Sequence, residues 1–369
     1  MKMISTMNIH KRYPQGKDNS KLRTTSMITK QIISTTVLTL LFLISCKKEV
    51  SLSSVNKPIY YTWEIHIHNI VAPNESVAFN NICEGLRRTA RIFENHNIKV
   101  NWGVMQNFAE AVVKYQTSED NIFIELENMG HEIGGHSLGY YEDPSEILIN
   151  RLGFTPKYFN LGVATVNNFK EQLKLIQNVF LSHNYKIMSD SYSWLSNSPG
   201  FDKLTYIWQP SFDPAVGNLF TSDPNNEVIA INIQGNGWQG GRDIDIVNEG
   251  NFEILKVLLI KFIENSKNGK INVFPIGSHF DVFTTGPLMQ EVVATINSLE
   301  LSRADPAVIR NYMQNSLRNN YDFKDIDFSE SAISALDNYL TEVIDPLMQK
   351  GIIISKTYSE IYEIYFCNK

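Results

Sequence analysis

The chain has 369 residues, with 33 Lys plus Arg against 39 Asp plus Glu, a formal net charge of −6 and three cysteines. This length can supply a large buried core, and 43 % hydrophobic with 20 % charged residues excludes a disordered or fibrous protein. Three cysteines exclude a disulfide-framework miniprotein or a four-thiolate zinc ribbon, and the acidic surplus argues against a nucleic-acid partner.

The N-terminus has the pattern of an export signal. Residues 33–44 form an apolar run that is too short to span a bilayer comfortably, with Lys30 just before it. The run ends in Leu-Ile-Ser-Cys at Cys46, which resembles the lipobox of bacterial lipoproteins, where the cysteine becomes the lipidated first residue. A short membrane anchor is the alternative.

We therefore predict a lipoprotein signal peptide over residues 1–45, with Met27 as a candidate start, and a polar tether over 46–57. The protein is expected to be exported and held by its lipid in the bacterial cell envelope, on the periplasmic or outer surface. Because NAD and ATP are scarce there, no nucleotide cofactor is expected. The glycine-rich run at 235–240 fits a dinucleotide pattern formally, but no clear helix follows it.

Strands and helices are predicted to alternate from residue 58 onward. The strand candidates are 60–68, 100–105, 131–136, 185–189, 204–208, 228–233, 271–276 and 352–355. The helix candidates are 79–93, 108–129, 167–183, 252–263, 332–348 and a last one after 355, with a helical surface insertion near 301–331. This order predicts an α/β fold of parallel strands covered by helices, either a barrel or an open sheet.

The run Glu64-Ile-His-Ile-His is the first candidate for chemistry. Alternate residues of a strand share a face, so Glu64, His66 and His68 lie together, opposite an apolar face that must meet the helices. Two imidazoles and a carboxylate that face into a barrel suit zinc or a similar divalent ion. The alternative is an exposed strand with a solvated polar face.

The second candidate is the run Gly-His-Glu-Ile-Gly-Gly-His-Ser at 130–137. It is not a zincin helix, because His131 and His136 are five residues apart and two glycines would break a helix. As a strand and turn, the glycines let the backbone bend and present His136.

This second run looks like the second motif of the polysaccharide deacetylases, carbohydrate esterase family four. The segment 154–159 looks like the family's third motif, and the run Ser-His-Phe-Asp around His279 is similar to its late histidine motif. The resemblance covers roughly residues 58–369 and implies a catalytic domain there, folded as an irregular (β/α) barrel of the seven-stranded type.

The chain departs from the family pattern at three positions. Tyr140 stands where the family has its second metal-binding histidine, and Asn160 stands where it has the third-motif arginine. The usual pair of first-motif aspartates is absent, with Glu64 and His66 nearby. These changes indicate either a rebuilt site, with His66 and His68 as compensating ligands, or an inactive one.

The resemblance implies a metal-dependent hydrolase that removes N- or O-acetyl groups from a polysaccharide or glycan. In this hypothesis a divalent metal, zinc in the first place, is held by His136 with His66 and/or His68. Glu64 is the general base, and His279 protonates the leaving group.

Aromatic residues are candidates for sugar binding, although ordinary core packing is the alternative for each of them. They are Tyr140, Trp194, Trp208 and Trp238. A second hypothesis for the whole protein is a lipid-anchored glycan-binding protein that keeps the deacetylase scaffold without its chemistry.

Overall fold

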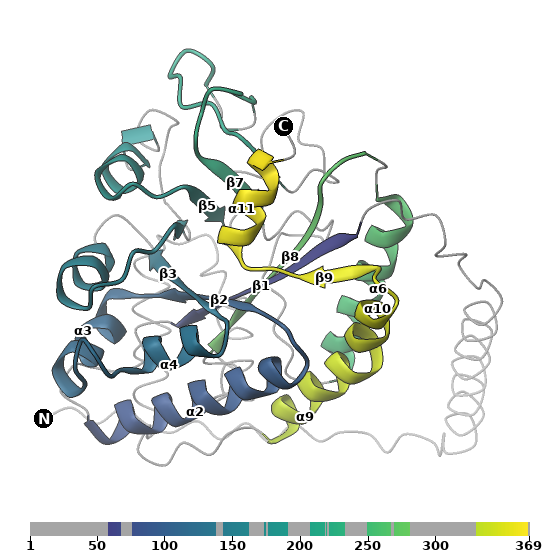
Figure 1. Cartoon of the computed structure of the whole chain (residues 1–369), viewed down its shortest axis with the longest axis horizontal. Coiled ribbons are helices and arrows are strands. Elements are labelled where there is room, and N and C mark those ends of the chain that lie inside the picture. Colours follow the sequence, from purple (N-terminus) through teal and green to yellow (C-terminus); the bar gives the residue numbers. More distant parts are fainter. Residues whose placement is uncertain are drawn as a thin grey trace, which may run out of the picture. The chain divides into compact units, whose positions relative to one another are not determined.

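Strand β1 (Ile59–Ile67) lies inside a nine-stranded sheet and pairs in parallel with three other strands (Figure 1). The computed structural model describes residues 58–67, 76–137, 143–161, 173–174, 176–190, 207–217, 219, 221–232, 249–266, 269–280 and 330–367. These residues all belong to one unit, residues 55–369.

The sheet follows a seven-stranded parallel path in the order β7-β5-β4-β3-β2-β1-β8. Its other members are β2 (Val100–Val104), β3 (Glu132–Ser137), β4 (Tyr158–Leu161), β5 (Ile187–Asp190), β7 (Ile229–Asn232) and β8 (Asn272–His279). The short β9 (Ile353–Ser355) adds to β1 in parallel, whereas β6 (Ile207–Trp208) pairs with β7 antiparallel. The predicted α/β class and seven-stranded parallel arrangement are confirmed, and the antiparallel β6 is the exception.

The described helices lie between the strands in sequence. They are α2 (Ser76–Asn95), α3 (Gln106–Tyr115), α4 (Ile122–Asn128), α6 (Glu249–Asn265), α9 (Glu330–Tyr339), α10 (Asp345–Gln349) and α11 (Tyr358–Cys367). Wider π-helical turns are η2 (Ile147–Arg151), η3 (Gln177–Leu181) and η6 (Leu340–Ile344). The last of these joins α9 to α10, so the single predicted helix over 332–348 is continuous but changes its hydrogen-bonding pattern.

One predicted helix is wrong in its length. The stretch 108–129 forms two helices, because the Asn121 side chain accepts hydrogen bonds from the backbone N–H groups of Phe123 and Ile124 and so starts α4 afresh. Strand β4 and the turn η2 were not predicted as separate elements.

The apolar face of β1 packs outward against helices, as predicted. The Trp63 ring meets Phe93 of α2 edge-on at 5.0 Å, and its indole N–H donates to the Ser278 hydroxyl of β8 at 2.7 Å. Residues 59, 61, 63, 65 and 67 are all fully buried. The opposite face of β1, with Glu64 and His66, therefore turns to the inside of the sheet.

A cluster of inward side chains shows that the sheet is curled. Ile187 and Ile229 of β5 and β7 belong to the same buried cluster as Val273 of β8, although these strands stand near opposite ends of the sheet order. Tyr358 and Ile361 of α11 complete this cluster. Helix α11 thus fills the space that the curled sheet encloses.

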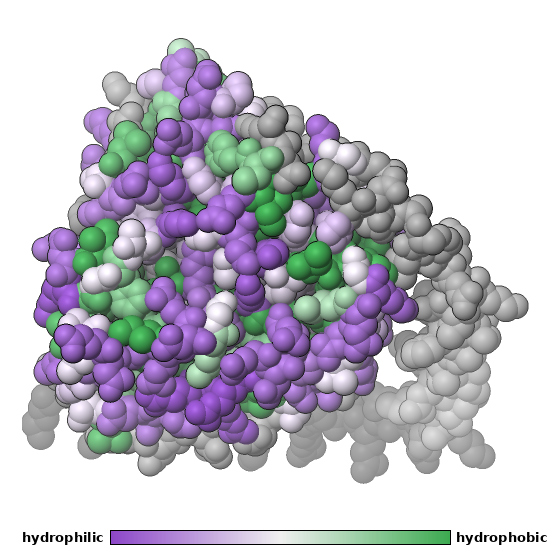
Figure 2. Space-filling view, in the orientation of Figure 1, coloured by the Kyte–Doolittle hydropathy of each residue, from purple (hydrophilic) through white to green (hydrophobic). Residues whose placement is uncertain are grey.

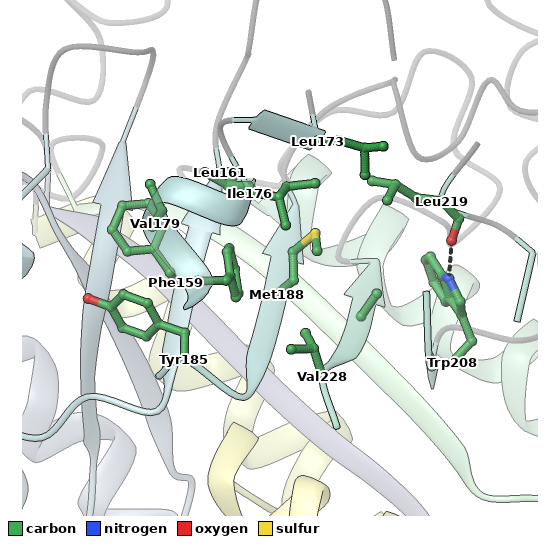
Figure 3. Packing of buried hydrophobic residues seen from close by; sticks show 12 residues of the cluster. Phe159, Leu161, Leu173, Ile176, Val179, Tyr185, Met188, Trp208, Leu219 and Val228 are labelled. Atoms are coloured by element: carbon green, nitrogen blue, oxygen red, sulfur yellow. Dashed lines mark hydrogen bonds between the residues drawn. The ribbon is translucent and has the colours of Figure 1, made fainter. Parts of the chain in front are cut away.

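The outer face of the same region forms a second core (Figure 3). Phe159 of β4 and Met188 of β5 pack there with Ile176 and Phe180 from the helical segment before β5. Alternation along β4 and β5 therefore sends one set of side chains outward to this core and leaves Asn160 and Ser189 on the inner face.

The surface over α2 and α9 is mainly hydrophilic (Figure 2). In the described part of the chain, no helix is both long and apolar enough to cross a membrane. The leader, Cys46 and the tether lie outside the described residues. Cys83 is buried and Cys367 is exposed, and both thiols are free.

Gly134 is expected to be essential for packing inside the barrel. A Cβ at this position would lie 2.3 to 2.5 Å from ring atoms of Tyr158, so Gly134→Ala should lower the free energy of unfolding by about 1–3 kcal/mol. Urea denaturation measures this change. The control is Glu94→Ala, at an exposed position on α2, where we expect a change within about 0.5 kcal/mol. Equal losses in both variants would contradict the packing argument.

Candidate active site

Polar side chains gather at the carboxyl ends of neighbouring strands, on the inside of the sheet. The strand register places His66 of β1 beside His279 of β8 and beside Gly103 of β2. It also places His136 of β3 beside Asn160 of β4. In parallel α/β folds this end of the sheet is where ligands bind.

Glu64 is fully buried, and polar side chains lie close to its carboxylate. The Tyr358 hydroxyl donates to its Oε2 at 2.8 Å, and its Oε1 lies 3.2 Å from Nε2 of His66. Burial and the Glu64 charge raise the pKa of Tyr358 well above 10, so the hydroxyl stays protonated and keeps donating. A fixed carboxylate beside an imidazole is a pair that can accept and move a proton.

The rings of His66 and His136 stack on each other. Their centroids are 4.1 Å apart and their planes differ by 16°. Gly103 makes this possible, because a Cβ there would lie 3.2 Å from Glu64 Oε1, His66 Cδ2 and His136 Cβ. The glycine on β2 thus opens the space in which two strands present their imidazoles.

Asn160 fixes the tautomer of His136. The amide Oδ1 lies 3.0 Å from Nδ1 of His136, and because this oxygen can only accept, Nδ1 carries the proton. The Nε2 atom is then unprotonated in the neutral ring and has a lone pair that can act as a base or a ligand. Asn160 therefore orients the ring of His136.

His279 stands at the end of β8 beside this cluster. Its ring centre is 5.3 Å from that of His66, edge to face, and the residue is partly exposed where Glu64, His66 and His136 are buried. The structure thus brings together four of the residues predicted from sequence. His68, the fifth, lies outside the described residues.

The donor types in this cluster suit a divalent metal, but the described residues do not complete a site for one. Within the described ranges no group of three His, Cys, Asp or Glu side chains is arranged to hold a metal ion. The expected zinc site with His136, His66 and/or His68 therefore stays a prediction.

The prediction that Trp208 binds sugar is wrong. Trp208 is 8 % exposed and belongs to the outer core, where its indole N–H donates to the Leu219 carbonyl at 2.8 Å (Figure 3). Its ring is on the helix-covered side of the sheet and faces neighbours such as Leu219 rather than the inner cluster. Tyr140, Trp194 and Trp238 lie outside the described residues.

His131 serves the fold instead of the chemistry. Its Nδ1 accepts from the Val100 N–H at 3.2 Å, and its Nε2 lies 3.3 Å from the Ala90 carbonyl oxygen, which can only accept. The neutral ring thereby joins α2 to β2.

Two contacts of the site were missed at the level of sequence. Tyr358 touches Glu64 across 294 positions of the chain, and no local pattern links them. Ser189 sits on the inner face of β5 beside Asn160, a position that strand alternation alone would have indicated.

Comparison with known proteins gives only distant similarities. No family model and no curated protein matches the sequence. Among solved structures, 4-alpha-glucanotransferase from Thermococcus litoralis is 16 % identical with a TM-score of 0.44, over 83 % of this chain and 40 % of that one. This chain thus spans two fifths of the glucanotransferase.

Two proteins named as polysaccharide deacetylases are also similar. The one from Mycobacterium smegmatis is 11 % identical over 82 % of this chain and 94 % of its own, and the one from Pseudomonas aeruginosa PAO1 is 13 % identical over 77 % and 91 %. Both have a TM-score of 0.37. Similarity at this level says nothing about activity, which rests on the residues of the chain itself.

The buried His131 should make stability depend on pH. Burial lowers its pKa from 6.5 to about 4, so the unfolded chain binds a proton between these values that the folded chain does not. The contribution of His131 to the free energy of unfolding is therefore complete above pH 6.5. At most about 3 kcal/mol of it is lost as the pH falls towards 4. Urea unfolding at pH 7 and pH 4.5 measures this loss, and His131→Asn should flatten it. An unchanged slope in the variant would assign the pH dependence to other groups.

Proposed function

We propose that the protein is a hydrolase that removes acetyl groups from an envelope or dietary glycan. The observation that carries the proposal is the buried cluster of Glu64, His66 and His136, with His279 at its exposed edge. Side chains that accept, hold and release protons meet there at one end of a parallel sheet. The motif resemblance at 130–137 supports an acetylated sugar as the substrate class.

The reaction follows from where each proton can go. Glu64 takes a proton from water, with Tyr358 and His66 holding the carboxylate in place. Each carboxylate oxygen has a second lone pair for this purpose. The water oxygen attacks the acetyl carbonyl carbon, and the carbonyl oxygen becomes an oxyanion.

His279 then completes the reaction. It donates a proton to the leaving nitrogen or oxygen as the bond from the carbonyl carbon breaks, which yields acetate and a free amine or hydroxyl group. Its partial exposure suits contact with a sugar that enters from solvent. The proton that Glu64 gained passes to His279, directly or through solvent, so both residues return to their starting protonation states.

A metal is part of the proposal but not of these steps. We propose that zinc is held by His136 with His66 and/or His68. Bound zinc would supply a water of lowered pKa and would polarise the acetyl carbonyl.

The same proposal places the protein in the bacterial cell envelope, attached through a lipid on Cys46. The lipobox-like sequence before this residue supports the anchor, and the polar tether after it supports a domain held away from the membrane.

Glu64→Gln is expected to remove hydrolysis. It replaces the proposed base with an amide of the same shape, and acetate release from N-acetylated chito-oligosaccharide or p-nitrophenyl acetate should fall at least 100-fold. The matched control is Glu110→Gln on the surface of α3, which should retain full activity. Undiminished acetate release by Glu64→Gln would remove Glu64 as the base, no acetate release by the wild-type protein would end the hydrolase assignment, and glycan binding without any release would favour the binding protein.

Zinc is tested by metal analysis of protein purified without a histidine tag. We expect about one zinc per chain and its loss in His136→Ala, measured by plasma mass spectrometry. The control is His183→Ala, a histidine that lies 3.4 Å from Asp143 and away from the cluster. Full retention of metal by His136→Ala would remove this residue from the ligand set.

A further inference from the structure

The inner face carries a row of polar side chains that the proposed proton transfers do not use. His136, Asn160 and Ser189 are cross-strand neighbours on β3, β4 and β5, and all three are fully buried. Asn160 Oδ1 faces His136 at 3.0 Å. The row therefore leads from the cluster of imidazoles towards β5.

Two hydrogen-bond donors in this row have no partner among the described residues. They are the Nδ2 group of Asn160 and the Oγ hydroxyl of Ser189. Buried polar groups in folded proteins are nearly always paired, and an unpaired one costs free energy. Two such groups lie on neighbouring strands and face the same interior. They indicate that a hydrogen-bond acceptor outside the described residues pairs with them.

The other buried asparagine on the inner face shows the contrast. Asn101 donates through Nδ2 to the Thr62 hydroxyl at 2.8 Å and to the Trp63 carbonyl at 2.9 Å, and its Oδ1 accepts from the Tyr358 N–H at 2.8 Å. The side-chain amide of Asn101 is thus fully paired. Among the described residues, the side-chain amide of Asn160 is paired only through its oxygen.

We propose that Asn160 Nδ2 and Ser189 Oγ form a donor pair that binds the carbonyl oxygen of an acetyl group. Both groups can donate to a single oxygen, and neither carries a charge that would demand an anion. The pair selects an acyl substituent on a sugar, and it stabilises the oxygen as negative charge develops there. This inference rests on the proposed function, because it names what holds the acetyl group that Glu64 and His279 would process.

Three substitutions in the full-length protein test the donor pair. Asn160→Asp keeps an acceptor for His136 Nδ1–H but loses the Nδ2 donor, Ser189→Ala loses the hydroxyl, and the control Thr89→Val removes another buried hydroxyl without a partner in the described part of the chain. Thr89 lies on α2, outside the sheet. We expect kcat for acetate release from p-nitrophenyl acetate to fall about 100-fold in each of the first two variants, with little change in KM. Thr89→Val should match wild type.

Thermal unfolding separates this role from a structural one. Ser189→Ala removes no hydrogen bond within the described chain, so its midpoint should not fall below that of wild type. A kcat equal to wild type in both Asn160→Asp and Ser189→Ala would overturn the donor pair, since the two groups would then serve only to hold water.

A binding measurement distinguishes failure of this inference from failure of the proposed function. Calorimetry in the Glu64→Gln background compares N-acetylated chitotetraose with its fully de-N-acetylated form. We expect at least tenfold tighter binding of the acetylated form, with this preference lost in Asn160→Asp and Ser189→Ala. Acetyl-dependent binding in a protein that releases no acetate would uphold the donor pair and reject the hydrolase. Equal affinity for both forms would reject the donor pair, whatever the activity.

Discussion

The hydrogen bond between Tyr358 and Glu64 is the contact on which the interior depends. A carboxylate that is fully buried needs donors, and this hydroxyl, 2.8 Å away, supplies one from α11. The helix is in turn fixed from its first residue, because the Tyr358 N–H donates to Asn101 of β2 and the Ser359 N–H donates to Glu132 of β3 at 2.9 Å. Helix α11 therefore connects strands β1, β2 and β3 from inside the sheet.

The second constraint comes from two glycines, whose lack of a side chain leaves room in the interior for the rings of neighbouring residues. Gly134 admits the Tyr158 ring, and Gly103 admits the imidazoles of His66 and His136. The aromatic rings of Tyr158 and Tyr358 meet edge to face at 5.1 Å and fill the lower layer. Nearer the carboxyl ends of the strands the inner side chains are polar. The packed rings below them leave these side chains little freedom to move.

Much of this arrangement follows from period-two alternation in the sequence. The pattern of β1 assigns its apolar residues to the helices and places Glu64 and His66 inside, and the glycine spacing at 130–137 identifies a strand that presents His136. Trp208 shows the limit of this reasoning, since an aromatic residue on a two-residue strand has too little pattern to reveal its face. The partnership of Tyr358 with Glu64 is beyond any local pattern, because only the curled sheet brings them together.

The long-range pairings of β1 also bear on how the chain acquires its structure. Strand β1, the first in the described part of the chain, pairs with β8 and β9, whose residues follow their partners by 213 and 294 positions, for instance Ile59 with Asn272 and Ile59 with Ile353. Closing such large loops costs entropy before any contact repays it, so topologies of this kind fold slowly. Until β8, β9 and α11 are in place, the polar interior is open to water and the edge of β1 that pairs with β8 is unpaired. Chaperones that bind extended chains would bind β1 in this interval. The late pairing of β1 with β8 and β9 would then limit the rate of folding.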